Sequence, residues 1–151
     1  MKTYKAITAA LIFAALPAVG QPATIPGTDT EGYFSRPEKY RMMDVRKASR
    51  NYAKCLKSEN DGIVESALAH VAYTRLILPT ADLKDLREAV EGLTNADRSP
   101  VIRYKAYLAS MVFVNPGLFT RTAATNYADG DEFFAAIAFQ LRHSLLGYRS
   151  E

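Results

Sequence analysis

The sequence predicts an all-α domain. Residues 62–78 and 101–114 form two helical segments that are apolar on nearly every side, and an amphipathic segment separates them. A helix without a broad polar face must be covered by neighbours on several sides. The second segment is also too short to cross a bilayer, which needs about 20 apolar residues. We therefore expect both segments to be inner helices in a stack of helices.

The first twenty residues have the pattern of a secretory signal peptide. Lys2 and Lys5 precede an apolar run over residues 6–15, and small residues precede a cleavage position after Gly20. The run is too short to span a bilayer comfortably, so we expect no stable membrane insertion after cleavage. This pattern predicts a signal peptide over residues 1–20 and a mature protein that is periplasmic or secreted.

The mature chain is close to neutral in charge. The whole sequence has 19 Lys and Arg residues against 16 Asp and Glu residues. Residues 1–20 hold two of the lysines and no acid, so 17 basic residues remain against 16 acidic ones, a net charge of +1. The two signs are interleaved, without a basic run that would follow a phosphate backbone. We therefore expect no nucleic acid as a partner.

Cys55 is the only cysteine, so no disulfide can form within the chain. It comes at the end of a helical pattern, where a small buried thiol is common. In an oxidising compartment an intermolecular disulfide is the alternative. The sequence leaves both states of Cys55 open.

Residues 21–35 contain prolines and glycines among threonines and show no helical or strand period. They predict a flexible linker, in which Tyr33 and Phe34 dock on the domain that follows. That domain is expected over residues 36–151.

Start and stop signals define the first two helices. Pro37 suits the first turn of a helix, and apolar residues then recur at spacings of three and four, which predicts a helix over residues 37–57. Asn60 or Asp61 can cap the first apolar segment, and Pro79 ends it.

An amphipathic third helix is expected after Thr80 or Asp82, either of which can serve as its cap. Its apolar positions are Leu83, Leu86, Val90 and Leu93. The opposite face carries Lys84, Arg87, Glu88 and Glu91, which form two oppositely charged pairs four residues apart. That face is most simply a solvated one.

Two further helices complete the domain. Ser99 and Pro100 are a strong start signal for the second apolar segment. Asp129 or Asp131 can cap a last helix, where Arg142 and His143 point away from the core. The residues expected to share its buried face are Phe134, Ile137, Ala138, Leu141, Leu145 and Tyr148.

The two apolar segments match in register at an offset of 39 residues, which places Ala67 on Ala106 and Ile63 on Ile102. A helical repeat near 40 residues is typical of HEAT arrays. The residues that carry the pattern are Asn60, Asp61, Gly62, Val64, Glu65, Ser66, Ala67 and Leu68, and then Ser99, Pro100, Ile102, Arg103, Tyr104, Lys105, Ala106, Tyr107 and Leu108. Over residues 44–116 the sequence resembles small exported bacterial proteins with HEAT-like repeats. The resemblance implies a short α-solenoid that binds through a gently curved face, and an irregular helical bundle is the alternative.

No pattern of a catalytic or metal site is present. His70 and His143 lie far apart in sequence, without a Cys, Asp or Glu at a recognised metal spacing. The acids of residues 129–132 do not fit a calcium loop, because the first and third positions of that loop would be Thr125 and Tyr127. We therefore expect no metal, no cofactor and no enzyme.

Tyrosines and basic residues gather on the second apolar segment. These residue types are favoured at protein interfaces, although tyrosines also fill space between helices. The predicted binding residues are Arg103, Tyr104, Lys105 and Tyr107, with Lys84, Arg87, Glu88 and Glu91 of the third helix. The expected function is an exported, non-catalytic scaffold for a protein partner. The alternatives are a small periplasmic enzyme or ligand carrier with a pocket between helices, and a self-associating structural protein.

Overall fold

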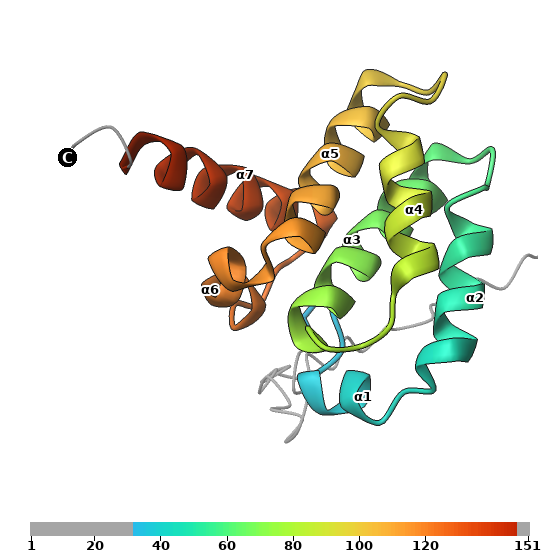
Figure 1. Cartoon of the computed structure of the whole chain (residues 1–151), viewed down its shortest axis with the longest axis horizontal. Helices are drawn as coiled ribbons and strands as arrows, with labels where there is room; N and C mark the ends of the chain where they lie inside the picture. The colour runs from blue at the N-terminus through green and yellow to red at the C-terminus, as the bar shows by residue number, and fades with distance from the viewer. Residues whose placement is uncertain (1–31, 148–151) are drawn as a thin grey trace, which may run out of the picture.

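The computed structural model describes residues 32–147, and Figure 1 shows how its helices are arranged. Within this range the chain forms seven α-helices, one 3₁₀ helix and no strand, which confirms the predicted all-α class. The predicted signal peptide, residues 21–31 of the predicted linker, and Tyr148 lie outside the described residues. The elements are α1 (Pro37–Arg41), α2 (Val45–Cys55), α3 (Asp61–Ile77), α4 (Lys84–Leu93), α5 (Pro100–Val114), η1 (Pro116–Phe119), α6 (Thr120–Ala123) and α7 (Gly130–Gly147).

The predicted helix over residues 37–57 is in fact two helices, α1 and α2. The chain leaves α1 at Met42, and Asp44 is the N-cap of α2. The Asp44 carboxylate accepts a hydrogen bond of 3.0 Å from the backbone N–H of Lys47. An aspartate at this position satisfies one of the free N–H groups of a helix start, so the chain can turn between α1 and α2 at little cost.

The two apolar helices begin at equivalent caps. Asn60 caps α3 and Ser99 caps α5. Their side-chain oxygens accept hydrogen bonds from the backbone N–H groups of Ile63 and Ile102, at 3.3 and 3.4 Å. Pro100 is the first residue of α5, where its fixed φ angle favours a helix. Both starts agree with the sequence prediction because capping depends on local residues.

The starts of α4 and α7 are built differently. Leu83 occupies the N-cap position of α4 and supplies no side-chain cap. The predicted cap Asp82 nevertheless contributes, because its carboxylate accepts a hydrogen bond of 3.3 Å from the backbone N–H of Lys84, the first residue of α4. Asp129 accepts a hydrogen bond of 2.8 Å from the backbone N–H of Glu132. The Glu132 carboxylate in turn accepts one of 2.6 Å from the N–H four residues earlier. This reciprocal arrangement fixes the start of α7.

The core is centred on α3 and α5, which lie side by side in Figure 1. α2 packs on α3, α4 packs on α5, and α2 and α4 also contact each other. Several of the buried side chains are alanines, which allow the two inner helices to approach closely. The buried residues are Val64, Ala67, Leu68, Ala69, Val71, Ala72, Tyr73 and Thr74 of α3, and Ile102, Lys105, Ala106, Leu108, Ala109, Ser110, Val112 and Phe113 of α5.

Lys105 joins three helices. Its ammonium donates hydrogen bonds to the carboxylates of Glu65 on α3 and Asp131 on α7, and it lies 5.9 Å from the centre of the Phe134 ring. Burial alone would lower the pKa of Lys105, but the bonds to Asp131 and Glu65 outweigh burial and raise it above its usual value. The ion pairs therefore attach the first turn of α7 to the two inner helices.

α7 is buried only in its N-terminal half. Its buried residues are Phe133, Phe134 and Ile137, whereas Leu145 and Leu146 are exposed. Figure 1 shows the C-terminal half extending away from the other helices. The expectation that Leu145 shares the buried face of this helix is therefore wrong. No helix of residues 32–147 is both long enough and apolar enough to cross a membrane.

The segment before α1 packs on the domain, as its aromatic residues predicted. Phe34 is buried and its ring stacks on Tyr73, with centroids 4.1 Å apart and planes 3° from parallel. The backbone N–H of Tyr33 donates to the carbonyl of Tyr127 at 2.8 Å, and the Tyr33 hydroxyl donates to Ser66 at 3.2 Å. Residues 33 and 34 therefore belong to the folded core, although the sequence assigned them to the linker.

Phe34→Ala should destabilise the protein by roughly 3–5 kcal/mol, because it removes a buried ring and leaves a cavity. The matched control is Phe139→Ala on α7, because the Phe139 side chain is 56% exposed whereas that of Phe34 is 7% exposed. The control should change stability by less than about 0.5 kcal/mol. Urea unfolding monitored by circular dichroism measures both, and equal effects of the two substitutions would show that Phe34 does not dock on the domain.

Lys105→Met should lower the free energy of unfolding by about 1.5–3 kcal/mol, the range for hydrogen bonds to charged groups. Its control is Lys84→Met, because Lys84 pairs with Glu88 at 3.8 Å on an exposed face and such pairs contribute less than about 1 kcal/mol. The same unfolding measurement applies. A Lys105→Met protein as stable as the control would contradict the role of Lys105 in holding α7.

Candidate interaction surface

An apolar groove of about 260 Å³ lies between α5 and the C-terminal half of α7. Its α7 wall belongs to the part of this helix that Figure 1 shows extending away from the other helices. The lining residues are Tyr104, Tyr107 and Leu108 of α5 and Ala138, Leu141, Arg142, Leu145 and Leu146 of α7. The two walls therefore come from α5 and α7, which are separated in sequence by the short helices η1 and α6.

The walls of the groove expose large apolar side chains to solvent. Tyr104 is 56% exposed and Leu145 is 66% exposed, and both Tyr107 and Leu146 are also exposed. Single exposed apolar residues are common on proteins, but a contiguous apolar patch with a polar rim marks an interaction site. The two tyrosines are residues of the type that interfaces favour.

The groove carries one positive charge. Arg142 is the one charged residue among its lining residues, which include no carboxylate. Arg142 is exposed, and no ion pair joins it to any residue from 32 to 147. The groove therefore presents an uncompensated positive charge beside an apolar surface.

The structure separates the predicted binding residues of α5. Tyr104 and Tyr107 line the groove, but Lys105 is buried in its ion pairs. Arg103 is half-buried, and its guanidinium donates a hydrogen bond of 2.6 Å to the carbonyl of Arg98 at the turn before α5. Neighbouring residues of a helix point in directions about 100° apart, so residues 103, 104 and 105 cannot all lie on one exposed face. Only the tyrosines of this set belong to the exposed surface.

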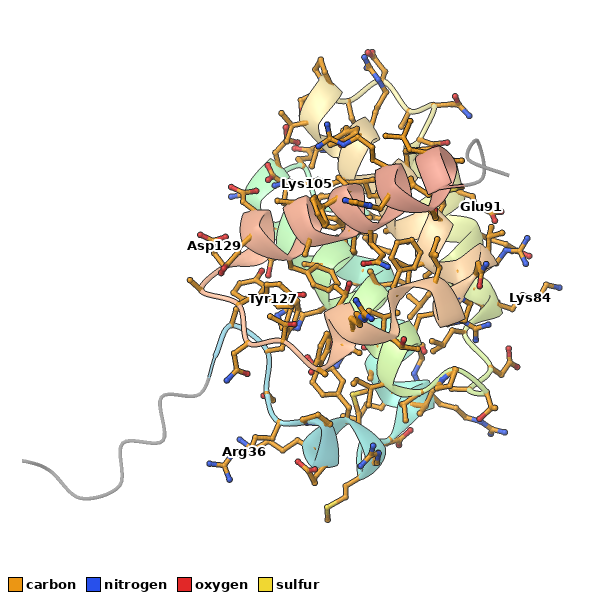
Figure 2. The ribbon with its side chains drawn as sticks, turned by 90° about the vertical axis from the view of Figure 1, so that its left-hand side faces the viewer. Arg36, Lys84, Glu91, Lys105, Tyr127 and Asp129 are labelled. Atoms are coloured by element: carbon orange, nitrogen blue, oxygen red, sulfur yellow. The ribbon has the colours of Figure 1, made fainter. Side chains whose placement is uncertain are left out.

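The predicted residues of α4 form a separate, solvated face. Lys84 pairs with Glu88 at 3.8 Å and Arg87 with Glu91 at 2.7 Å. Three of these side chains are exposed, and that of Glu91 is partly exposed. Figure 2 shows Lys84 and Glu91 at the edge of the molecule opposite Asp129. None of the four lines the groove, and their charges already satisfy one another.

Sequence reasoning missed the α7 wall of the groove. It placed Leu145 on the buried face, although this residue is exposed. The expectations for Leu141, which packs partly against the core, and for Arg142, which is exposed, agree with the structure, but they did not indicate that both residues line a groove. The signal that was available is the adjacent pair Leu145 and Leu146, because two successive leucines cannot both lie on one narrow stripe of a helix.

A second cavity, of about 330 Å³, lies between α2 and α3 and includes His70 in its lining. Stacked rings flank the imidazole: Tyr33 at 5.4 Å between centroids and Tyr52 at 6.2 Å. The Tyr40 hydroxyl lies 3.1 Å from His70 Nδ1. Burial lowers the pKa of His70 and raises the pKa of Tyr40. The imidazole is therefore neutral at neutral pH and part of an aromatic cluster.

This second cavity brings His70 together with Tyr52 and Cys55, but not with a carboxylate. Its lining residues are Tyr52, Cys55, Asn60, Gly62, Ile63, Ser66, Ala67 and His70, without a carboxylate among them. Cys55 is half-buried here. Among the residues that the structure describes, no three His, Cys, Asp or Glu residues are placed to hold a metal ion. The cavity thus offers no combination of His70 with a carboxylate and a tyrosine hydroxyl.

Known proteins provide no relative from which to transfer a function. No protein-family model matches the sequence, and no curated protein or solved structure matches it. The choice between the groove and the cavity therefore depends on their geometry. The groove is the more exposed apolar surface, and it contains two of the residues that the sequence selected.

The stability of the protein should fall as the pH falls below about 6.5, the usual pKa of histidine. Because the pKa of His70 is lowered in the folded state, the unfolded chain binds more protons in this range, and acid shifts the equilibrium towards it. Urea unfolding at about pH 7.5 and pH 5 would measure the fall.

His70→Gln removes this titration, so its stability should fall less between the two pH values than that of the wild type. His143→Gln is the matched control, because His143 is exposed at the end of α7, and it should retain the wild-type pH dependence. The same slope in all three proteins would exclude His70 as the titrating group.

Proposed function

We propose that this protein is an exported, non-catalytic interaction module that binds a protein partner in the groove between α5 and α7. The exposed apolar groove carries the proposal, because leaving Tyr104, Leu145 and Leu146 in water contributes nothing to the folding of the chain alone. The burial of such side chains against a partner is favourable, and shape and composition both suit a protein surface.

The arrangement of helices supports a HEAT-like origin for the scaffold. α2 with α3 and α4 with α5 form two successive helix pairs whose inner helices contact each other. The N-caps Asn60 and Ser99 are 39 residues apart, close to the period of HEAT repeats. The correspondence is incomplete, because Ile63 is exposed whereas Ile102 is buried. In such an array the last pair needs a cap on its open flank, and α7 covers only part of that flank.

Export is supported by the charged, apolar and small-residue pattern of residues 1–20. A periplasmic or secreted location would place the groove in contact with envelope or extracellular proteins. The alternative of an enzyme or ligand carrier has less support. The cavity beside His70 contains no carboxylate, and a cavity of about 420 Å³ that includes Tyr127 and Glu132 contains no histidine.

Site-specific photo-crosslinking in the cells that produce the protein tests the proposal. A crosslinking amino acid at position 107 or 146 should capture a defined protein, because both positions line the groove. The same amino acid at position 87, on the solvated face of α4, should not capture it. Tyr104→Ala combined with Tyr107→Ala should reduce capture from position 146 at least about tenfold, the effect of losing roughly 1.4 kcal/mol of binding energy.

The double substitution should leave the melting temperature within a few degrees of the wild type, because both tyrosine side chains are exposed. Capture from position 87 alone, or capture from position 146 that does not depend on the tyrosines, would exclude the groove as the binding site.

A further inference from the structure

We infer that the groove between α5 and α7 binds an apolar helix of a partner protein that carries carboxylates beside its apolar face. The inference depends on the proposed function and adds the chemistry of the partner. The inference is based on three observations: the helical walls of the groove, the small volume of the groove, and the charge of Arg142, which pairs with no residue from 32 to 147.

The shape of the groove favours a helix as its occupant. Tyr104, Tyr107 and Leu108 on one wall recur at helical spacing, as do the groove residues of α7. A third helix laid between two helices buries its apolar ridge against the side chains of both. The volume of about 260 Å³ is below the roughly 300–1,000 Å³ typical of small-molecule sites. An open trough between two helices therefore suits a row of side chains better than an enclosed ligand.

The charges of the groove specify carboxylates on the partner. Arg142 is the lone charge in the lining and pairs with no residue from 32 to 147. The acids of α7 lie at its other end, where Asp131 binds Lys105 and the Glu132 carboxylate accepts the Ala128 N–H. A carboxylate that approaches Arg142 therefore meets no competing acid of the groove. Such complementarity contributes mainly to the choice of partner and to the rate of association.

The same charges disfavour a second copy of this chain as the occupant. In a two-fold symmetric pair the same patch of each subunit faces its counterpart. Each groove would then meet a second lining that carries an arginine and no carboxylate, so neither Arg142 would gain an acidic partner from the other groove. Charge complementarity is absent from such a pair, so a different protein is the better occupant.

Two synthetic helical peptides provide the test. Both carry leucines at positions i, i+3, i+4 and i+7, and the flanking positions are glutamate in one peptide and lysine in the other. Fluorescence anisotropy with the mature chain should give about tenfold tighter binding of the glutamate peptide, in proportion to one favourable charge contact of roughly 1.4 kcal/mol. Tyr107→Ser should weaken the binding of both peptides, because it removes apolar surface from the groove.

Arg142→Glu should reverse the preference, so that the lysine peptide binds more tightly. Arg50→Glu is the matched control, because Arg50 is exposed on α2 and does not line the groove; its preference should equal that of the wild type. Arg142→Ala should reduce the preference without reversing it. Circular dichroism establishes that each variant is folded.

Equal affinity for the two peptides, binding of neither peptide, or a preference that Arg142→Glu leaves unchanged would each overturn the inference. Sedimentation velocity measures whether the mature chain forms a dimer. A dimer that Leu146→Asp dissociates would also overturn the inference, because a second copy of the chain would then occupy the groove. The crosslinks from positions 107 and 146 test separately whether a natural partner uses the groove. A charge-independent partner would therefore leave the proposed function in place, whereas failure of the crosslinks would contradict the function itself.

Discussion

The architecture depends on the buried ammonium of Lys105. A buried charge is tolerated only when it is paired, and the partners here are Glu65 on α3 and Asp131 at the start of α7. These contacts fix where α7 begins. Beyond Ile137 no comparable anchor appears in the described part of α7, and the helix runs away from α5. The groove is therefore a consequence of α7 being attached firmly at one end only.

The parts of the fold that depend on neighbours in sequence could be predicted. The starts of α3 and α5 followed from Asn60 and Ser99, because a cap bonds N–H groups two or three residues away. The buried position of both helices followed from their lack of a polar face. The break before α2 could not be predicted in the same way. Asp44 is equally compatible with the polar face of a continuous helix and with an N-cap, and packing decides between them.

The candidate site could be predicted only in part, for a related reason. Tyr104 and Tyr107 were identified by residue type, but Lys105 between them points in another direction. Which side of α5 is covered depends on the path of α7, and that path is set by a contact between residues 105 and 131. The same dependence applies to Leu145, whose apolar character predicted burial. A side chain is buried only where another element packs against it, and the sequence of one helix does not determine which elements pack against it.

The free energies of apolar burial and of association explain why charge, rather than apolar area, should select the partner. Complete burial of a fully exposed large apolar side chain contributes about 1.5–3 kcal/mol. The two tyrosines and two leucines of the groove are 44–66% exposed, so covering what remains of them contributes roughly 3–6 kcal/mol in total. Association costs about 4–15 kcal/mol in lost freedom of motion, so these apolar contacts offset only part of that cost. An added contact of about 1.4 kcal/mol changes affinity tenfold. Under these conditions one charge beside the groove, that of Arg142, is sufficient to separate an acidic helix from a basic one with the same apolar face.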